Sequence, residues 1–411
     1  MEHRVAITGL GVISTYGTGK DVLWENVRQG ISGIRLTQAF DTADYSVKIS
    51  GECIDFNPEE FIDPKEAKHN DRFIQFALAA SKLCVGDSGI DFEKYDRERI
   101  GVILGTGIGG LATITRDAIL LEKRGPRRVS PFYIPASTPN MSSGVVAIEH
   151  GLKGPNFVLA SACASASHAM GESFNYISRG IVDAMLTGGS EAAIVPAGYA
   201  GFANMGALSK RNDDPQRASR PFDKERDGFI IGEGGVIMLF ENWDQAQKRN
   251  AHIYGEVVGY GLTADAHHVT APAPGGEGAV RSMNMALKSA GITSDEIDYI
   301  NAHGTSTPFN DKTETVAIKT VFGDRAYKIP VSSTKGVVGH LLGASGAIEL
   351  AASLMGMQYG MVHMTANQEV FDPECDLDYV PNESREHKIR YMMKNSFGFS
   401  GQNAALIIKA A

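Results

Sequence analysis

The segment Leu159-Ala-Ser-Ala-Cys-Ala-Ser-Ala-Ser-His-Ala-Met170 decides how its part of the chain folds. The apolar run Phe157 to Leu159 leads into small residues, and apolar residues then recur with the spacing of one helix face. That face consists of Ala166, Met170, Phe174 and Ile177. The pattern predicts a strand, a tight turn and a helix with Cys163 at its N-terminus, which is a building unit of folds that cover sheets with helices.

Similar units recur along the 411 residues, because apolar runs bounded by glycine alternate with helix-length segments. The sequence therefore predicts an α/β fold. Strands are expected at Val5 to Thr8 (within an extended Met1 to Ser14), Ile100 to Leu104, Phe157 to Leu159, Ala184 to Thr187, Gly234 to Phe240, Ile253 to Tyr260, Ile297 to Asn301 and Ala404 to Ile408. Helices are expected at Asp71 to Asp87, Ala164 to Arg179, Gly276 to Ala290, Asp311 to Phe322 and Gly346 to Tyr359.

The two halves of the chain share a weak internal repeat. Strand Ile100 to Leu104 precedes a second strand and the helix near Cys163, and Ile297 to Asn301 precedes Val331 to Thr334 and the helix after Gly346. Two similar halves with loops at a common centre would explain the length. The residues alone do not decide between a duplicated fold and a fold without internal duplication.

Composition excludes several classes of protein. With 43% hydrophobic and 21% charged residues the chain is typical of a globular protein, and its net charge of −9 argues against binding nucleic acid or an anionic membrane. No run approaches the roughly 18 apolar residues of a membrane span, and the N-terminus lacks a signal-peptide pattern. We expect a cytoplasmic protein.

Cys163 is the strongest chemical candidate. The dipole at a helix N-terminus favours a thiolate over a thiol, and small neighbours let a thioester approach the backbone. A free cysteine among Ala and Ser could equally be core filler. Cys53 and Cys84 lack such surroundings and are interpreted as structural, and the carboxylates around Cys375 should disfavour its thiolate.

Two histidines, His303 and His340, follow expected strands in glycine-rich turns, where parallel sheets build their sites. A lone histidine there is more often a hydrogen-bonding residue, but two together with Cys163 favour function. Zinc is a weak alternative, because the histidines are 37 residues apart and no CxxC or HExxH spacing accompanies them.

Four ordered motifs now make the comparison specific: Ala162-Cys163-Ala-Ser-Ala166, His303-Gly-Thr-Ser-Thr-Pro308, Ser333-Thr-Lys335 through Gly339-His340-Leu-Leu-Gly343, and Asn395-Ser-Phe-Gly-Phe399. Together they resemble the Cys-His-His signature of the β-ketoacyl-acyl carrier protein synthases, and the resemblance covers nearly the whole chain. Length and motif order resemble the synthase II subgroup best.

The resemblance implies a thiolase-like fold of two βαβαβαββ halves forming a five-layered α-β-α-β-α core. We expect one half at residues 1–249, with the nucleophile and cap insertions, and the other at 250–411, with both histidines. It also implies a homodimer that performs decarboxylative Claisen condensation in fatty-acid synthesis.

The resemblance further implies roles for individual residues. Cys163 would carry the acyl chain, backbone N–H groups of Cys163 and Phe399 would form an oxyanion hole, and His303 and His340 would hold the malonyl thioester oxygen. Lys335 would support the histidines, with Glu349 orienting Lys335. The alternative for that pair is an ordinary surface salt bridge.

Substrate contacts are implied as well. Thr305 and Thr307 would bind the pantetheine arm, Ile108 would line the acyl channel and Phe399 would gate it. The alternatives are plain turn residues for the threonines and ordinary core for Ile108. The final motif departs from the family's Gly-Phe-Gly-Gly, because Ser400 replaces a glycine, which puts chain-length preference in doubt.

The expected partner is acyl carrier protein, which brings its own phosphopantetheine, so we expect no bound cofactor and no metal. The carrier is acidic, and basic candidates for docking it are Lys65, Lys68, Lys210, Arg211 and the run Lys123-Arg-Gly-Pro-Arg-Arg128.

Alternatives inside the family are a synthase I type enzyme, a polyketide ketosynthase or a noncatalytic pocket-shaping subunit. Outside it, Gly105-Thr-Gly-Ile-Gly-Gly110 fits the GxGxxG pattern of a dinucleotide-binding oxidoreductase, but without the acidic residue expected about 20 positions later.

Overall fold

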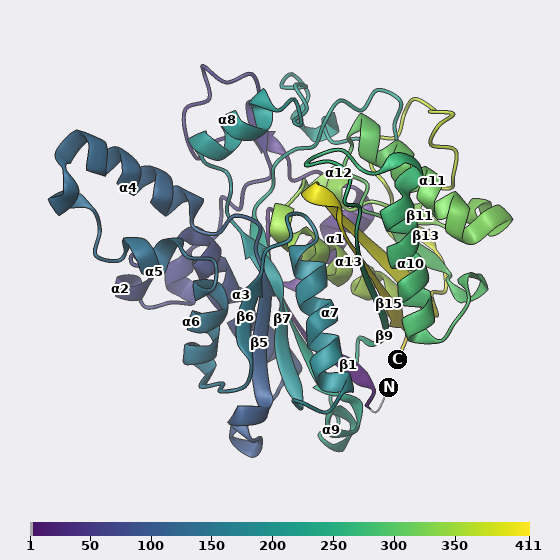
Figure 1. Cartoon of the computed structure of the whole chain (residues 1–411), viewed down its shortest axis with the longest axis horizontal. Coiled ribbons are helices and arrows are strands. Elements are labelled where there is room, and N and C mark those ends of the chain that lie inside the picture. The colour runs from purple at the N-terminus through teal and green to yellow at the C-terminus, as the bar shows by residue number, and fades with distance from the viewer. Residues whose placement is uncertain (1–2) are drawn as a thin grey trace.

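The computed structural model describes residues 3–411, and its centre is a single mixed sheet of 11 strands (Figure 1). The strand order is β11-β10-β14-β15-β9-β1-β8-β7-β5-β6, with β2 paired to β1. The strands are β1 (Val5–Ser14), β2 (Gly17–Thr18), β5 (Ile100–Gly105), β6 (Asn156–Leu159), β7 (Ala184–Glu191), β8 (Gly234–Asn242), β9 (Gly255–Ala264), β10 (Tyr299–Asn301), β11 (Val331–Ser332), β14 (Tyr391–Gly398) and β15 (Gln402–Lys409). Small two-stranded sheets pair β3 (Arg35–Leu36) with β4 (Ile49–Ser50) and β12 (Met361–Val362) with β13 (Arg385–Glu386).

Thirteen α-helices accompany these strands in the described part of the chain. They are α1 (Lys20–Gln29), α2 (Pro64–Ala67), α3 (Arg72–Ser88), α4 (Leu111–Arg124), α5 (Tyr133–Ser137), α6 (Met141–His150), α7 (Ser165–Ser178), α8 (Pro196–Asn204), α9 (Trp243–Lys248), α10 (Glu277–Ala290), α11 (Pro308–Phe322), α12 (Lys335–Val338) and α13 (Ser345–Tyr359).

The fold is duplicated. The elements β1, α3, β5, α6, β6, α7, β7 and β8 are followed by the matching series β9, α10, β10, α11, β11, α13, β14 and β15. Within each half the strand order and the parallel or antiparallel sense of each pair are the same, and β1 joins β9 at the centre. The predicted internal repeat is therefore confirmed. The division at residues 249 and 250 stays a prediction, which the gap between β8 and β9 supports.

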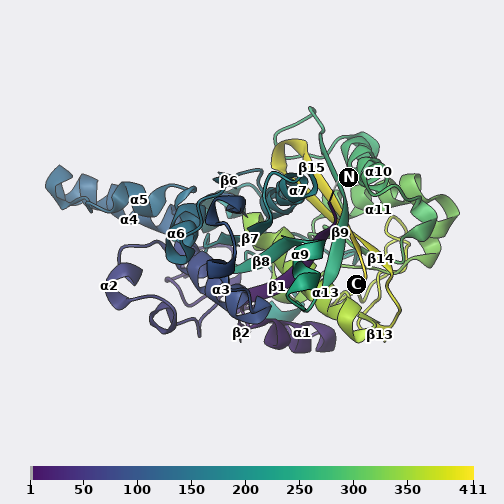
Figure 2. The ribbon, with the colours of Figure 1, turned by 90° about the horizontal axis from the view of Figure 1, so that it is seen from below.

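The layers follow from the helix positions. Helix α3 packs on β1 and β8, α10 packs on β9 and β15, and Figure 2 shows these two helices on either side of strands β8 and β9. Helices α7 and α13 contact each other and strands of both halves. Apolar residues of α7 and α13 form one buried cluster with those strands. The layers are therefore α3, the strands of the first half, α7 with α13, the strands of the second half, and α10, which is the expected five-layered core.

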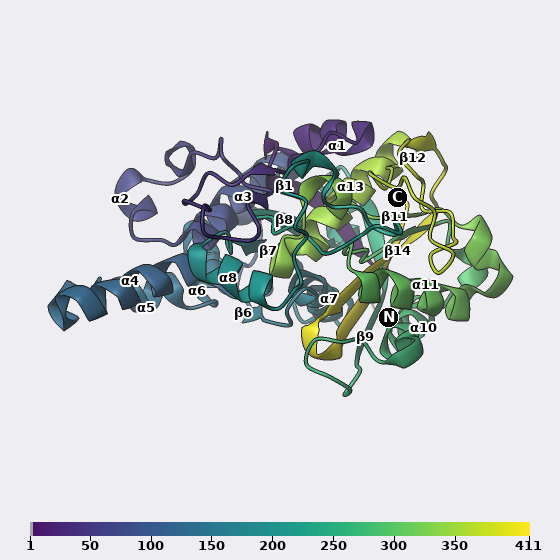
Figure 3. The ribbon, with the colours of Figure 1, turned by 90° about the horizontal axis from the view of Figure 1, so that it is seen from above.

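Insertions in the first half form an extension of the molecule. Figure 3 shows α2, α4 and α5 at one end and α10 and α11 at the other. The sequence did not predict α1, α4, α6 or strand β14. In β14 the buried polar residues Lys394, Asn395 and Ser396 interrupt the apolar pattern that marks a central strand.

The expected elements are present, with ends shifted by a few residues at most places. The first strand begins at Val5 and continues to Ser14, and Met1 and Glu2 lie outside the described residues. Across residues 3–411, no helix combines the length and apolar character needed to cross a membrane.

We predict that Gly105→Ala destabilises the protein. A Cβ at Gly105 would lie 2.3 Å from the backbone nitrogen of Ala166, so the end of β5 could no longer pack on the first turn of α7. We expect a loss of about 1–3 kcal/mol in the free energy of unfolding, measured by urea denaturation. Gly86→Ala is the control, because nothing lies near its Cβ position and alanine favours the helix α3 by up to about 1 kcal/mol. Equal effects of the two substitutions would contradict the packing argument.

Candidate active site

A cavity of roughly 500 Å³ opens between the two halves of the chain. Its lining brings together the side chains that the sequence singled out: Cys163, His303, His340, Thr305, Thr307, Ile108 and Phe399. Lys335 and Glu349 lie behind this lining, buried in the protein. Residues more than 200 positions apart in the chain thus meet at one site.

Cys163 is turned into the cavity by a strained backbone. Ala162, directly before it, has a φ of 49°, in the left-handed region that non-glycine residues rarely adopt, and α7 begins two residues after Cys163. The side chain is 7% exposed. Burial raises the pKa of its thiol to about 12, while the positive charge of Lys335 acts in the opposite direction. The helix position expected from sequence is present, and the raised pKa makes the thiol the resting form of Cys163.

His340 presents a defined tautomer to this sulfur. Its Nδ1 accepts a hydrogen bond from the Leu342 N–H at 3.2 Å and lies 2.6 Å from the Ser345 hydroxyl. A backbone N–H can only donate, so Nδ1 is unprotonated and the ring proton is on Nε2. That Nε2 lies 3.0 Å from Cys163 Sγ.

His303 is held in the same tautomer by Lys335. The Lys335 ammonium lies 3.3 Å from His303 Nδ1 and also donates to the His303 carbonyl. Both carboxylate oxygens of Glu314 accept backbone N–H groups, from His303 and Gly304, at 2.8 Å each. The His303 and His340 rings lie 5.5 Å apart at an angle of 81°, so two Nε2–H donors serve one cavity.

Both imidazoles are neutral. Burial, and next the positive charge of Lys335, lower the pKa of His303 and of His340 well below the ordinary value of 6.5. Lys394 contributes in the same direction to both. The site therefore offers two neutral donors rather than an imidazolium.

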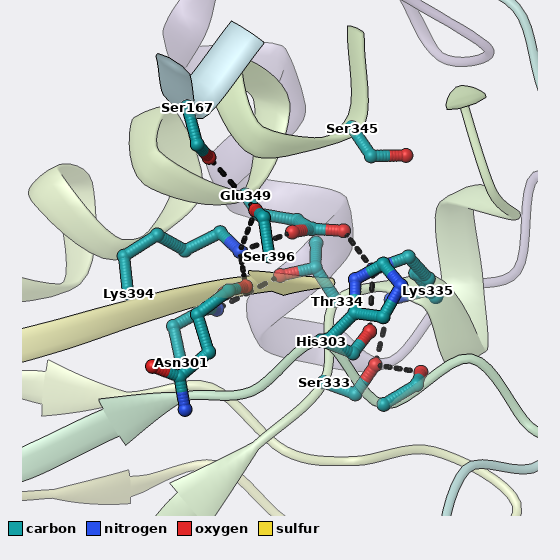
Figure 4. A network of polar contacts seen from close by, with 12 residues as sticks. Ser167, Asn301, His303, Ser333, Thr334, Lys335, Ser345, Glu349, Lys394 and Ser396 are labelled. Atoms are coloured by element: carbon teal, nitrogen blue, oxygen red, sulfur yellow. Dashed lines mark hydrogen bonds and ion pairs between the residues drawn. The ribbon is translucent and has the colours of Figure 1, made fainter. Parts of the chain in front are cut away.

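Lys335 and Glu349 form a buried ion pair, and each side chain is 1% exposed. The alternative of a surface salt bridge is therefore wrong. The second oxygen of Glu349 lies 2.7 Å from the ammonium of Lys394, which the sequence analysis missed (Figure 4). The only sequence signal for Lys394 was its place directly after the apolar residues Tyr391 to Met393.

The charges around Cys163, His303 and His340 disfavour a bound zinc ion or another cation. The ligand atoms of Cys163, His303 and His340 lie within 4.8 Å of one another, which is close enough for a metal. However, the Lys335 ammonium contacts His303 directly and repels a cation at that position. The donor set fits a metal in distance but not in charge.

The remaining predicted residues lie around the rim. The hydroxyls of Thr305 and Thr307 are 2.8 Å apart, and Thr307 caps α11, as expected for the alternative of a turn residue. Phe399 is followed by Ser400, whose φ of 63° is a conformation that glycine adopts without strain, and the Ser400 N–H donates to the Val269 carbonyl at 2.7 Å. The serine thus ties the Phe399 loop to a neighbouring loop.

Backbone donors of the glycine-rich loop after β5 already bind a carboxylate of the protein itself. The carboxylate of Glu191, a residue that the sequence analysis missed, accepts the N–H groups of Gly107 at 2.6 Å, Ile108 at 3.3 Å and Gly343 at 3.0 Å. An anion could not replace this buried carboxylate without leaving it unpaired. The dinucleotide hypothesis is therefore rejected. Glu191 instead joins the loop of Ile108 to the loop that follows His340.

Comparison with known proteins agrees with this geometry. Residues 2–245 match the N-terminal domain of beta-ketoacyl synthase, and residues 254–369 match its C-terminal domain. The chain belongs to the beta-ketoacyl synthase family. It is 49% identical over 408 residues to 3-oxoacyl-(acyl-carrier-protein) synthase 2 of Synechocystis sp., covering 99% of this chain and 98% of that one.

Two solved structures share the fold over the full length of both chains. One is the ishigamide ketosynthase/chain length factor, with a TM-score of 0.94 and 34% identity. The other, with a TM-score of 0.91 and 32% identity, is a type II polyketide synthase acyl-carrier protein in complex with its ketosynthase bound to the hexaketide.

We predict that neither His303 nor His340 titrates between about pH 8 and pH 6, because burial and Lys335 hold each pKa below the value of about 6.5 found in unfolded chains. Histidine nitrogen NMR shifts should show protonated Nε2 and unprotonated Nδ1 throughout. In Lys335→Met, loss of the neighbouring charge should raise both pKa values. A midpoint near 6.5 for either ring in the unsubstituted protein would contradict this account.

Proposed function

We infer that this chain elongates acyl groups by decarboxylative Claisen condensation. An acyl thioester on Cys163 reacts with malonyl-acyl carrier protein to give 3-oxoacyl-acyl carrier protein, the elongation step of fatty-acid synthesis. The observation that carries this inference is the placement of Cys163 Sγ 3.0 Å from a neutral histidine donor, with a second such donor in the same cavity. Family membership supports it.

The first step is acyl transfer. Cys163 loses its thiol proton as its sulfur attacks the thioester carbonyl of the acyl carrier, and this proton ends on the pantetheine sulfur, which leaves as a free thiol. The Nε2–H of His340 and the N-terminus of α7 stabilise the thiolate that burial disfavours. Backbone N–H groups of Cys163 and Phe399 stabilise the carbonyl oxygen as it becomes negative.

The second step is decarboxylation and condensation. The malonyl thioester oxygen accepts the Nε2–H groups of His303 and His340, so that negative charge on this oxygen is stabilised as the carbon–carbon bond breaks and carbon dioxide leaves. The resulting enolate carbon attacks the acyl carbonyl on Cys163. The sulfur then leaves as a thiolate, and the product is two carbons longer.

Other residues support these steps. Lys335, oriented by Glu349, keeps His303 neutral and in the required tautomer. Thr305 and Thr307 bind the pantetheine arm, Ile108 lines the acyl channel and Phe399 gates it. The apolar part of the cavity, including Phe202, Phe229, Met205 and Leu342, suits an alkyl chain.

Acyl carrier protein is the proposed partner, and it supplies the phosphopantetheine, so the chain needs no bound cofactor or metal of its own. A structurally similar ketosynthase is solved with an acyl-carrier protein. The basic candidates on α2 and at the end of α4, Lys65, Lys68 and the run from 123 to 128, are exposed. They lie at the same end of the molecule and favour an acidic partner (Figure 3).

A cytoplasmic homodimer is the proposed form of the enzyme. Strand β6 lies at the edge of the large sheet, and the neighbouring helices expose Ile134 and Ile148, which are 62% and 77% exposed. An unpaired edge strand beside exposed apolar residues favours pairing with a second copy.

The elongation reaction is favoured over polyketide assembly. Identity to synthase 2 of Synechocystis sp. is 49%, against 32 to 34% for the two ketosynthase structures. The noncatalytic subunit alternative is disfavoured, because Cys163, His303 and His340 lie together in one cavity.

We predict that Cys163→Gln separates the two steps. The variant should lose acyl-enzyme formation and condensation, yet still convert malonyl-acyl carrier protein to the acetyl form with release of carbon dioxide, because both histidine donors remain. His303→Ala is the matched variant: it should still form acyl-enzyme but lose decarboxylation by about 10²–10³-fold. Intact-protein mass and carbon dioxide release measure the two steps. Loss of both steps in correctly folded Cys163→Gln would contradict the assignment of decarboxylation to the histidines.

A further inference from the structure

Lys394 is a charged residue in the middle of a buried strand. It lies in β14 after Met392 and Met393, and its side chain is 0% exposed. Burying an ammonium ion costs several kcal/mol unless the ion is paired and hydrogen-bonded. A methionine or leucine would fill such a position without this penalty, so the lysine requires an explanation.

The contacts of Lys394 with its neighbours supply part of this explanation. Its ammonium lies 2.7 Å from Glu349 Oε2, donates to the Ser396 hydroxyl at 3.1 Å and also donates to the Asn395 carbonyl. Ser396 in turn lies 2.7 Å from the Ser167 hydroxyl on α7. The ammonium is thus fixed from three sides and linked to the helix that begins beside Cys163.

Glu349 is shared between two lysines. Its Oε1 pairs with Lys335 and its Oε2 pairs with Lys394, which fixes the plane of the carboxylate (Figure 4). Without Lys394, the carboxylate could rotate about its last bonds, and Lys335 would no longer be directed at His303 Nδ1, 3.3 Å away. A continuous chain of contacts therefore runs from Lys394 through Glu349 and Lys335 to His303.

We propose that Lys394 is a positioning residue for the decarboxylation step: it anchors Glu349 so that Lys335 holds His303 with its Nε2–H directed into the cavity. The inference rests on the proposed function. The direct hydrogen bonds of the acyl-transfer side do not include Lys394: Cys163 contacts His340, and His340 Nδ1 is held by Leu342 and Ser345.

The test compares Lys394→Met with the unsubstituted enzyme in two assays. Methionine keeps an unbranched side chain, one atom shorter than that of lysine, and removes the charge. We expect the kcat of malonyl-acyl carrier protein decarboxylation to fall about tenfold, less than loss of a direct donor would cause, with KM changed by less than about threefold. The rate of acyl-enzyme formation, followed by intact-protein mass, should stay within about threefold.

Lys409→Met is the matched control. Lys409 lies on the neighbouring strand β15, opposite Tyr391, and its side chain is partly exposed. The same substitution there should leave both rates unchanged. A fall in decarboxylation equal to that of Lys394→Met would show that loss of any nearby charge suffices, and would overturn the proposal.

A double-mutant cycle tests the route through Glu349. If Lys394 acts by anchoring that carboxylate, Lys394→Met should change the decarboxylation rate by no more than about twofold in a Glu349→Gln background. Additive effects would contradict this route. Equal losses of acylation and decarboxylation, accompanied by a lowered Tm, would indicate a purely structural role and would also overturn it.

Two further measurements keep the outcomes distinct. If Lys394→Met does not fold, Lys394→Gln, which retains a hydrogen-bond donor without the charge, replaces it in both assays with the same expectation for their ratio. If the unsubstituted enzyme forms no acyl-enzyme and releases no carbon dioxide, the proposed function fails. If it does both and the folded variants match it, only the role of Lys394 fails.

Discussion

The site depends on how closely two helix N-termini approach each other at the centre of the duplicated fold. Helices α7 and α13 meet at Gly346, where a Cβ would lie 2.2 Å from Ser167 Oγ, and the loops beside them meet at Gly343, where a Cβ would lie 2.1 Å from the Gly107 nitrogen. Because the two halves pack this tightly, Cys163 and His340, which precede α7 and α13, come within hydrogen-bond distance. Backbone packing, rather than flexible loops, therefore fixes the positions of the nucleophile Cys163 and its donor His340.

Electrostatics then sets the protonation states that the chemistry needs. Burial alone would leave a neutral thiol and neutral imidazoles, and it would not choose between the two tautomers of each ring. Backbone and hydroxyl groups choose the tautomer of His340, and the buried Lys335 chooses that of His303. The carboxylate of Glu349 in turn compensates the lysine charges, since buried ions persist in proteins only when they are paired.

Sequence reasoning recovered the elements with strong apolar periodicity and the residues carried by recognisable motifs. The strand, turn and helix around Cys163 and the repeat in the second half both have local signatures. Glu191 and Glu314 have none, and Lys394 is marked only as a lysine beside an apolar run, because the roles of all three depend on loops and helices far away in the chain that converge only after folding. The pKa of Cys163 was also beyond the sequence, because the helix dipole can be read from local pattern whereas the extent of burial cannot. Strand β14 was not predicted because its polar residues Lys394, Asn395 and Ser396 find their partners Glu349, Glu314 and Ser167 on other elements.

The most direct test of the account is intact-protein mass spectrometry on the enzyme incubated with hexadecanoyl or shorter acyl carrier proteins, and again after malonyl-acyl carrier protein is added. The account predicts an acyl-sized mass increase that peptide mapping places on Cys163. That increase should disappear on addition of the malonyl carrier as a 3-oxoacyl product two carbons longer is released. An acyl group mapped to another residue, or a Cys163 adduct that the malonyl carrier leaves unchanged, would contradict it.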